Sequence, residues 1–253
     1  MNKSIAEITD SIQDSLFRIG GVSAIICAGV YFLALGIYIP AYRVAPPPST
    51  ILEWFTLFQA KPLTGLFFLG LADIFITILW VPISLALYIG LKQSNQAWTM
   101  IAVSFVFVGI ALFLATNTAF AMHYLSRQYA TTATATQRAS LLSAGQAMIA
   151  VTEGARMLPL LPLGAFILST VMLSSRVFSK AMAWIGILGF ALLSASGLFA
   201  GYATTGPMTA IVSVIVGITY AGGGLLSFVW YILIGLRLLK LGRLEGKLFP
   251  QPS

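Results

Sequence analysis

The feature that most constrains this chain is the length of its stretches without charge. Between Arg18 and Arg43 there are 24 consecutive uncharged residues, and between Lys180 and Arg237 there are 56. An α-helix needs about 20 predominantly apolar residues to cross a hydrocarbon core ~30 Å thick. The first stretch therefore predicts one membrane-spanning helix. The second predicts two, joined by a turn at Tyr202–Pro207.

Three further stretches bring the number of predicted spans to six. The segments 62–91, 93–126 and 157–175 each hold one span, and Asp73 is the only Asp, Glu, Lys or Arg within them. The predicted fold class is therefore all-α, a polytopic bundle that forms a single integral membrane domain over residues 1–253. The spans are predicted to cover residues 20–41, 64–91, 98–123, 157–175, 181–201 and 208–238.

The composition excludes a soluble protein. Hydrophobic residues make up 58% of the chain and charged residues 8%, whereas a typical soluble domain has roughly 25% charged residues. Lys and Arg number 14 against 7 Asp and Glu. These basic residues lie at the ends of the apolar runs, where topology signals belong, so no nucleic-acid partner is predicted.

Few side chains are suited to chemistry. Cys27 is the only cysteine and His123 the only histidine, which excludes an internal disulfide and a metal centre built on several such residues. We predict no metal, no cofactor and no catalytic residue. Whether the chain is an enzyme stays open, since a lipid-modifying activity that uses Asp73 or Glu153 is compatible with this inventory.

The distribution of Lys and Arg predicts that both termini are cytoplasmic and that the protein lies in the cell membrane. With the N-terminus inside, the inner side has nine basic residues and the outer side five. The inner set is Lys3, Arg18, Lys92, Arg176, Lys180, Arg237, Lys240, Arg243 and Lys247. The outer set is Arg43, Lys61, Arg127, Arg138 and Arg156. In the basic tail at 239–253 and just before it, Arg237, Lys240, Arg243 and Lys247 are predicted contacts for anionic lipid headgroups.

Two outer connections are predicted to be helical. After the turn at Ala45–Thr50, Thr50 and Glu53 have the spacing of a capping box, so a short helix that lies at the membrane interface is expected over residues 51–60. In the second connection, apolar residues repeat on one face of a helix over residues 137–151. Those apolar residues are Leu141, Leu142, Met148 and Ile149. This helix is expected to run on into span four with a bend near Pro159 and Pro162.

The two ends of the chain carry further expectations. Residues 1–19 have an apolar stripe opposite acidic residues, which predicts an amphipathic helix on the cytoplasmic surface. The stripe consists of Ile5, Ile8, Ile12 and Leu16. The sixth span is longer than a membrane requires, so we expect it to be tilted or broken at Gly222–Gly224.

Asp73 is the first candidate site residue, because a charge within a membrane span is costly. It lies about nine residues into span two, roughly 13 Å from the outer end at ~1.5 Å per residue. Thr77, Ser84 and Tyr88 follow on the same helical face. The stripe predicts a proton site, a cation site or a substrate contact; an Asp that is protonated or hydrogen-bonded to neighbouring helices is the alternative.

Other polar residues fall at a similar depth or further out. Asn117 is expected to lie level with Asp73, so the two side chains could meet or simply join helices. Glu153 and Arg156 have the spacing of a pair along one helix face. His123 lies at the outer end of span three. Together they predict an outward-facing polar vestibule. Its candidate residues are Asp73, Thr77, Asn117, His123, Glu153 and Arg156.

Four segments together resemble a bacterial family of six-span membrane proteins that is a domain of unknown function. They are Leu85–Lys92 (LALYIGLK), Leu125–Ala130 (LSRQYA), Gln137–Met148 (QRASLLSAGQAM) and Phe228–Gly242 (FVWYILIGLRLLKLG). The resemblance extends over most of the chain from span one onward. It implies the six-span fold, and it implies no activity and no site residue.

Two functional hypotheses follow from these patterns. The first is a small transporter or sensor with an outward-facing vestibule around Asp73. The alternative is a non-enzymatic accessory or scaffold subunit of a larger membrane complex, which the amphipathic segments favour. A homo-oligomer or a partner within a membrane complex is compatible with either, and the lipid bilayer is the common partner.

Overall fold

A computed structural model describes residues 2–44, 48–200 and 209–248, with side chains for residues 12–34, 36, 48–200 and 211–243. The described residues form ten α-helices and contain no β-strand. Six helical segments are long and apolar enough to cross a membrane. These are Ile12–Ala34, Leu71–Leu91, Gln96–Thr131, Ala135–Met172, Lys180–Ala200 and Ile211–Arg243. The prediction of an all-α, multi-pass membrane protein with six spans is confirmed.

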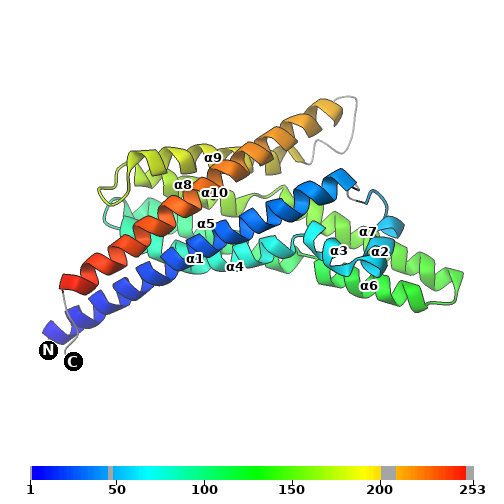
Figure 1. Ribbon diagram of the computed structural model, residues 1–253, viewed down its shortest axis with the longest axis horizontal. Helices are drawn as coiled ribbons and strands as arrows, with labels where there is room; N and C mark the ends of the chain where they lie inside the picture. The colour runs from blue at the N-terminus through cyan, green and yellow to red at the C-terminus, as the bar shows by residue number, and fades with distance from the viewer. Residues whose placement is uncertain (1, 45–47, 201–208, 249–253) are drawn as a thin grey trace.

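Six helices pack side by side in a closed ring (Figure 1). In ring order, each helix contacting the next and the last contacting the first, they are α1 (Asn2–Val44), α4 (Leu71–Leu91), α5 (Gln96–Thr116), α8 (Leu160–Met172), α9 (Lys180–Ala200) and α10 (Thr209–Leu248). Fully buried aromatic rings fill the centre. Trp80 stacks on Trp230 with 5.8 Å between ring centroids, and Phe190 meets Trp230 edge-on at 5.0 Å.

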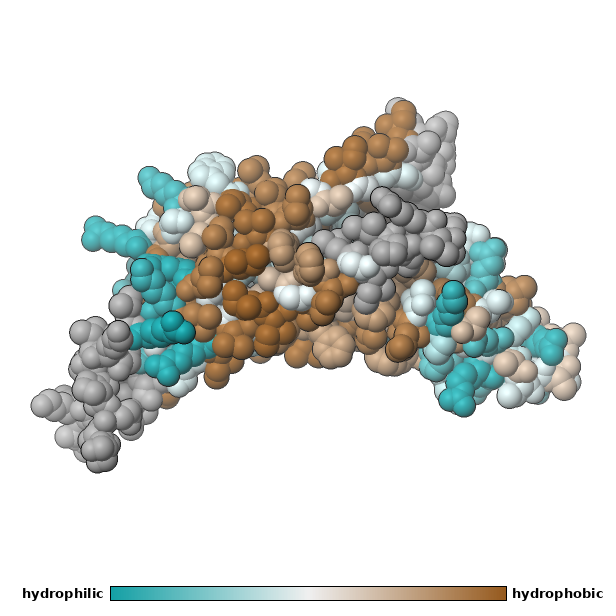
Figure 2. All heavy atoms as spheres, viewed as in Figure 1, coloured by the Kyte–Doolittle hydropathy of each residue, from teal (hydrophilic) through white to brown (hydrophobic). Residues whose placement is uncertain are grey.

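Both ends of the described chain lie at the same end of the ring, where α1 begins and α10 ends (Figure 1). We call this the terminal end. There the Nε atom of Arg18 donates a hydrogen bond to the carbonyl of Gly242 at 3.0 Å. Figure 2 shows a hydrophobic band between two hydrophilic ends. Which face of a membrane the terminal end occupies stays a prediction.

The sixth span was expected to be tilted or broken, and of these two alternatives α10 shows no break. α10 runs through Gly222–Gly224 without interruption, and Figure 1 shows it inclined across the ring. The glycines serve close packing instead. A Cβ built on Gly223 would lie 2.9 Å from the carbonyl oxygen of Gly189, and Gly224 lies directly against the hydroxyl of Tyr31.

The N-terminal segment is helical and continuous with the first span, since α1 begins at Asn2. Of its predicted apolar stripe, Ile12 is 55% exposed and Leu16 is half-buried. The side chains of Ile5 and Ile8 lie outside the described residues. So do the predicted turn at 202–207 and residues 45–47 of the first outer connection.

The structure divides two predicted spans into separate helices. The segment predicted as span two contains α3 (Pro62–Phe68) and α4, which begins only at Leu71. The segment predicted as span three contains α5, which ends at Thr116, and α6 (Ala119–Thr131). Span four begins with α8 after a break before Leu160, which agrees with the bend expected near Pro159.

Four helices form a second, smaller unit at the end opposite the terminal end (Figure 1). These are α2 (Ile51–Ala60), α3, α6 and α7 (Ala135–Arg156), and we call them the cap. Phe55, Phe58 and Met122 form its buried centre. The stripe predicted over residues 137–151 packs against this centre, so that segment is a helix whose apolar face is covered by the cap.

The predicted capping box at the start of α2 is confirmed. The Oγ1 atom of Thr50 accepts a hydrogen bond from the amide of Glu53 at 3.2 Å, and the Glu53 carboxylate accepts from the amide of Thr50 at 3.2 Å. The same carboxylate accepts from the amide of Ser49 at 2.7 Å. These hydrogen bonds, chiefly those from Ser49, hold the pKa of Glu53 below its ordinary value.

Small residues allow the ring helices to approach closely. A Cβ built on Gly164 of α8 would lie 2.6 Å from the carbonyl oxygen of Ala102 and 2.8 Å from the amide nitrogen of Val106, both on α5. Backbone atoms cannot move aside as a flexible side chain can. Where lipid surrounds the helices, such close approach is a main source of helix association.

We predict that Gly164→Ala destabilises the protein by about 1–3 kcal/mol, because overpacking forces α5 and α8 apart. Gly29→Ala is the matched control, since a Cβ there meets nothing within 4 Å. Unfolding in mixed detergent and SDS micelles, followed by circular dichroism, measures the difference. Equal transitions for the two variants would contradict the close α5–α8 contact.

Candidate functional site

The first element of the site is the break between α3 and α4. Gly70 has φ +92°, a left-handed conformation that glycine adopts without steric cost. This turn places Asp73 in the first turn of α4, where the unpaired amides of a helix N-terminus favour a carboxylate. Asp73 therefore lies near the start of its helix and not nine residues into a span. The sequence-based depth was too great because the break was not foreseen.

The second element is the break between α5 and α6. Asn117 leaves the helical conformation with φ −71° and ψ 118°. Its side chain then supplies the hydrogen bonds that the broken helices lack. The Nδ2 atom donates to the carbonyl of Leu69 at 3.0 Å, and the Oδ1 atom accepts from the amide of Ala119 at 3.1 Å. One amide side chain thus joins both breaks.

The predicted meeting of Asp73 and Asn117 occurs at Gly70. A Cβ built on Gly70 would lie 3.2 Å from the Oδ2 atom of Asp73 and 3.3 Å from the Nδ2 atom of Asn117. Glycine at this position therefore gives both the turn and the space that brings the two polar groups together. The depth of Asn117 in a membrane stays a prediction.

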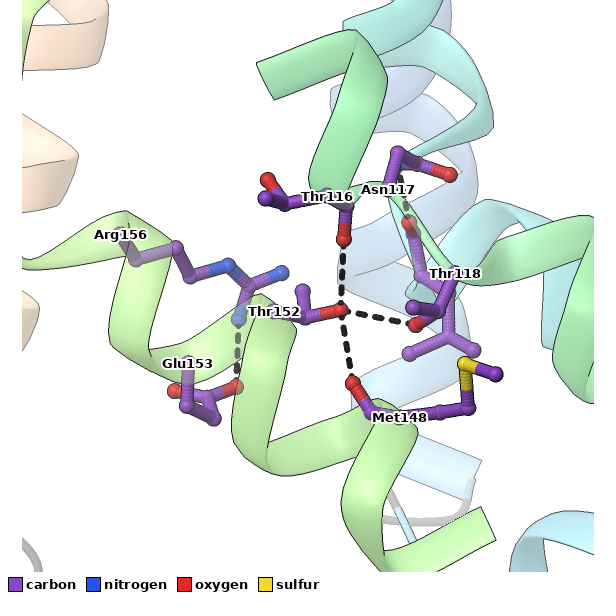
Figure 3. A network of polar contacts seen from close by, with 8 residues as sticks. Thr116, Asn117, Thr118, Met148, Thr152, Glu153 and Arg156 are labelled. Carbon is purple, nitrogen blue, oxygen red and sulfur yellow. Dashed lines mark hydrogen bonds and ion pairs between the residues drawn. The ribbon is translucent and has the colours of Figure 1, made fainter. Parts of the chain in front are cut away.

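The third element is the break between α7 and α8, which Thr152 ties to the second. The Thr152 hydroxyl lies 2.7 Å from the Thr118 hydroxyl and donates to the carbonyl of Thr116 at 3.1 Å or of Met148 at 3.2 Å (Figure 3). Thr116 and Thr118 flank Asn117. Thr152 and Asn117 therefore both form hydrogen bonds with residues at the break between α5 and α6.

Glu153 and Arg156 follow Thr152 along α7 and form the predicted pair. The Nη1 atom of Arg156 lies 2.9 Å from the Oε1 atom of Glu153, and both side chains are 46% exposed (Figure 3). Gly197 of α9 packs on the backbone here, since a Cβ on it would lie 2.9 Å from the Arg156 carbonyl oxygen. Arg156 is also close enough for its charge to act on the Asp73 carboxylate.

Asp73 itself is half-buried and lacks a direct partner. Among the described side chains, no hydrogen bond or ion pair to its carboxylate is found, and the only ion pair is Glu153–Arg156. The polar stripe that follows Asp73 along α4 consists of Thr77, Ser84 and Tyr88. Thr77 and Ser84 are buried and Tyr88 is half-buried.

A family model described as "Domain of unknown function (DUF4386)" matches residues 19–242. The chain belongs to this family. The predicted resemblance to a six-span family of unknown function is thereby confirmed. Comparison with curated proteins and with solved structures finds no match. The DUF4386 match extends from the first span through the cap to α10 and so includes all three helix breaks.

One candidate residue of this DUF4386 protein lies apart from the others. His123 packs on Phe58 of α2 with 5.6 Å between ring centroids, and its Nδ1 atom is buried without a hydrogen-bond partner. It therefore belongs to the interior of the cap. Among the described residues of the DUF4386 domain, no cluster of three His, Cys, Asp or Glu side chains could hold a metal ion.

Sequence reasoning missed Thr118 and Thr152 as parts of the DUF4386 site. The run Thr116–Asn117–Thr118 carried a usable signal, since Asn and β-branched residues weaken a helix interior. Thr152 carried none. Its importance arises only because the fold places α7 beside the end of α5.

We predict that Thr152→Val weakens the junction of the breaks. Valine keeps the shape and removes the hydroxyl that reaches the Thr116 carbonyl, which lowers the free energy of unfolding by about 0.5–2 kcal/mol. Thr219→Val is the control, because the Thr219 hydroxyl bonds only carbonyls of its own helix. SDS titration of both variants measures the change; an equal loss in both would remove Thr152 from this role.

Proposed function

We propose that this DUF4386 protein is a small transporter or sensor that binds a cationic solute or a proton at Asp73. The observation that carries the proposal is the position of Asp73 beside the helix breaks at Gly70 and Asn117, where no described residue forms a hydrogen bond or an ion pair with its carboxylate. A charged side chain in a membrane protein is costly to keep. The nearby Arg156 forms an ion pair with Glu153, so the carboxylate of Asp73 is available to a ligand.

The three breaks support a binding role for a second reason. A continuous helix hides its backbone polar groups, whereas a broken helix presents them. Membrane transporters commonly form their sites where helices are interrupted, since free amides and carbonyls can contact ions and polar groups there. At this junction the side chains of Asn117 and Thr152 satisfy some of these groups. The carboxylate of Asp73 adds a negative charge beside them.

The ion pair between Glu153 and Arg156 could control the access of a ligand to Asp73. Both side chains are 46% exposed and Arg156 lies within electrostatic range of Asp73. Arg156 can therefore exchange between the two acids when a ligand cation arrives or leaves. Such an exchange would couple occupancy of the site to the position of α7 and the α7–α8 break.

The proposal predicts that Asp73→Asn abolishes ligand response. A panel of monovalent cations and small amines is tested on purified wild-type protein by thermal shift, and proton flux is measured in liposomes with an enclosed pH-sensitive dye. We expect any ligand found with the wild type to bind at least ~tenfold more weakly to Asp73→Asn, since a charged hydrogen bond is lost.

Glu53→Gln provides the matched control. It removes one carboxylate charge from the exposed start of α2, outside the helix breaks, and should bind ligand and move protons as the wild type does. The proposal fails if Asp73→Asn retains every response of the wild type, or if Glu53→Gln loses the same responses.

A second candidate function, a scaffold subunit of a membrane complex, is favoured by the first part of α10. Ile211, Val214 and Ile218 are 60%, 60% and 67% exposed, and a Cβ on Gly217 would meet nothing within 4 Å. A partner helix could pack on this face. Extraction in a mild detergent distinguishes the candidates, because a scaffold should co-purify with a different membrane protein, and purification as a monomer or homo-oligomer would exclude it.

A further inference from the structure

A membrane-facing groove between α5 and α8 provides a surface that the proposed function does not use. Its volume is about 300 Å³ and it is open on one side. Phe166, Ile167 and Val171 give it an apolar floor, and the exposed indole of Trp98 forms a wall. Asn95 and Ser174 lie at the polar end. An apolar slot with a polar end matches the outline of a lipid.

Basic residues lie close in sequence to the polar end of the groove. Lys92 lies three residues before Asn95, and Arg176 lies two residues after Ser174. The end of α4 that precedes Lys92 contacts the segment that follows Arg176, since a Cβ on Gly90 would lie 3.2 Å from the ring of Phe178. The guanidinium of Arg237 is also bound to this region through the carbonyl of Val177 at 2.7 Å.

These cations have no acidic partner among the described residues. Arg176 is exposed, Lys92 is half-buried, and neither side chain forms an ion pair or a hydrogen bond with the described residues. Positive charge without a counter-charge beside an apolar slot is complementary to an anionic amphiphile. We propose that the groove binds an anionic phospholipid, with its phosphate at Lys92 and Arg176 and one acyl chain along Phe166 and Ile167.

The position of Trp98 agrees with this occupant. Trp98 is 53% exposed in the first turn of α5, at the terminal end of the ring. Tryptophan is enriched at the level of lipid headgroups because its ring is apolar and its N–H is polar. A bound lipid would therefore have its headgroup level with Trp98 and its chain below, in the same orientation as the surrounding bilayer.

The test measures retention of phosphatidylglycerol against phosphatidylcholine of the same acyl chains. The protein is purified from nanodiscs that contain both lipids in equal amounts, and lipids that stay bound in mild detergent are counted by native mass spectrometry. The wild type should retain phosphatidylglycerol preferentially. Lys92→Gln/Arg176→Gln should lower that preference by roughly fivefold for each cation removed.

Two further variants separate the groove from general surface charge. Lys61→Gln/Arg127→Gln removes the same charge from exposed positions in the cap, and should retain the wild-type preference. Thr170→Trp fills the groove from its exposed rim and should reduce retention of both lipids, whatever their charge. Circular dichroism and gel filtration confirm that each variant is folded.

The inference is overturned if Lys92→Gln/Arg176→Gln keeps the preference, or if Lys61→Gln/Arg127→Gln loses it equally. It is also overturned if Thr170→Trp retains as much lipid as the wild type. Should the charge variant fail to fold, Thr170→Trp decides alone. None of these results bears on Asp73, so the lipid site and the proposed function fail or stand independently.

Discussion

The structure depends on the need to satisfy backbone polar groups wherever a membrane helix is interrupted. Away from water, each unpaired amide or carbonyl costs several kcal/mol. Three breaks near one another would multiply that cost. Side-chain hydrogen bonds of Asn117 and Thr152, which cross from one break to another, offset this free-energy cost. The breaks can exist because they lie together, since each supplies partners to its neighbour.

This mutual dependence explains the relation between the ring and the cap. α3 and α6 leave the ring at the breaks, and their apolar faces pack with α2 and α7 around Phe55, Phe58 and Met122. Packing within the cap therefore fixes the positions of the helix ends at the breaks, and the breaks set the directions of α3 and α6. Asp73 occupies the position where these layers meet.

The sequence predicted the six spans and the all-α class because both follow from the lengths of apolar runs along the chain. It also predicted the capping box at Thr50 and Glu53, the helix over 137–151 and the bend near Pro159, each of which has a local signature. The breaks at Gly70 and Asn117 were missed because a single Gly or Asn in an apolar run is common in unbroken membrane helices. The grouping of Asp73 with Asn117 was anticipated, whereas the separation of His123 depends on how α6 packs against α2.

The ring order has a consequence for how the protein is made. α1 closes the ring by packing against α10, which follows the other five ring helices in the chain, with Gly21 against the backbone of Leu239 and Gly235 against the side chain of Ile25. Until α10 is inserted, α1 and α9 present to lipid the faces on which α10 packs. Before α10 is inserted, the insertion machinery or a chaperone must therefore keep other hydrophobic segments away from the seam between α1 and α9. Quality control can recognise an unfinished molecule by its open seam.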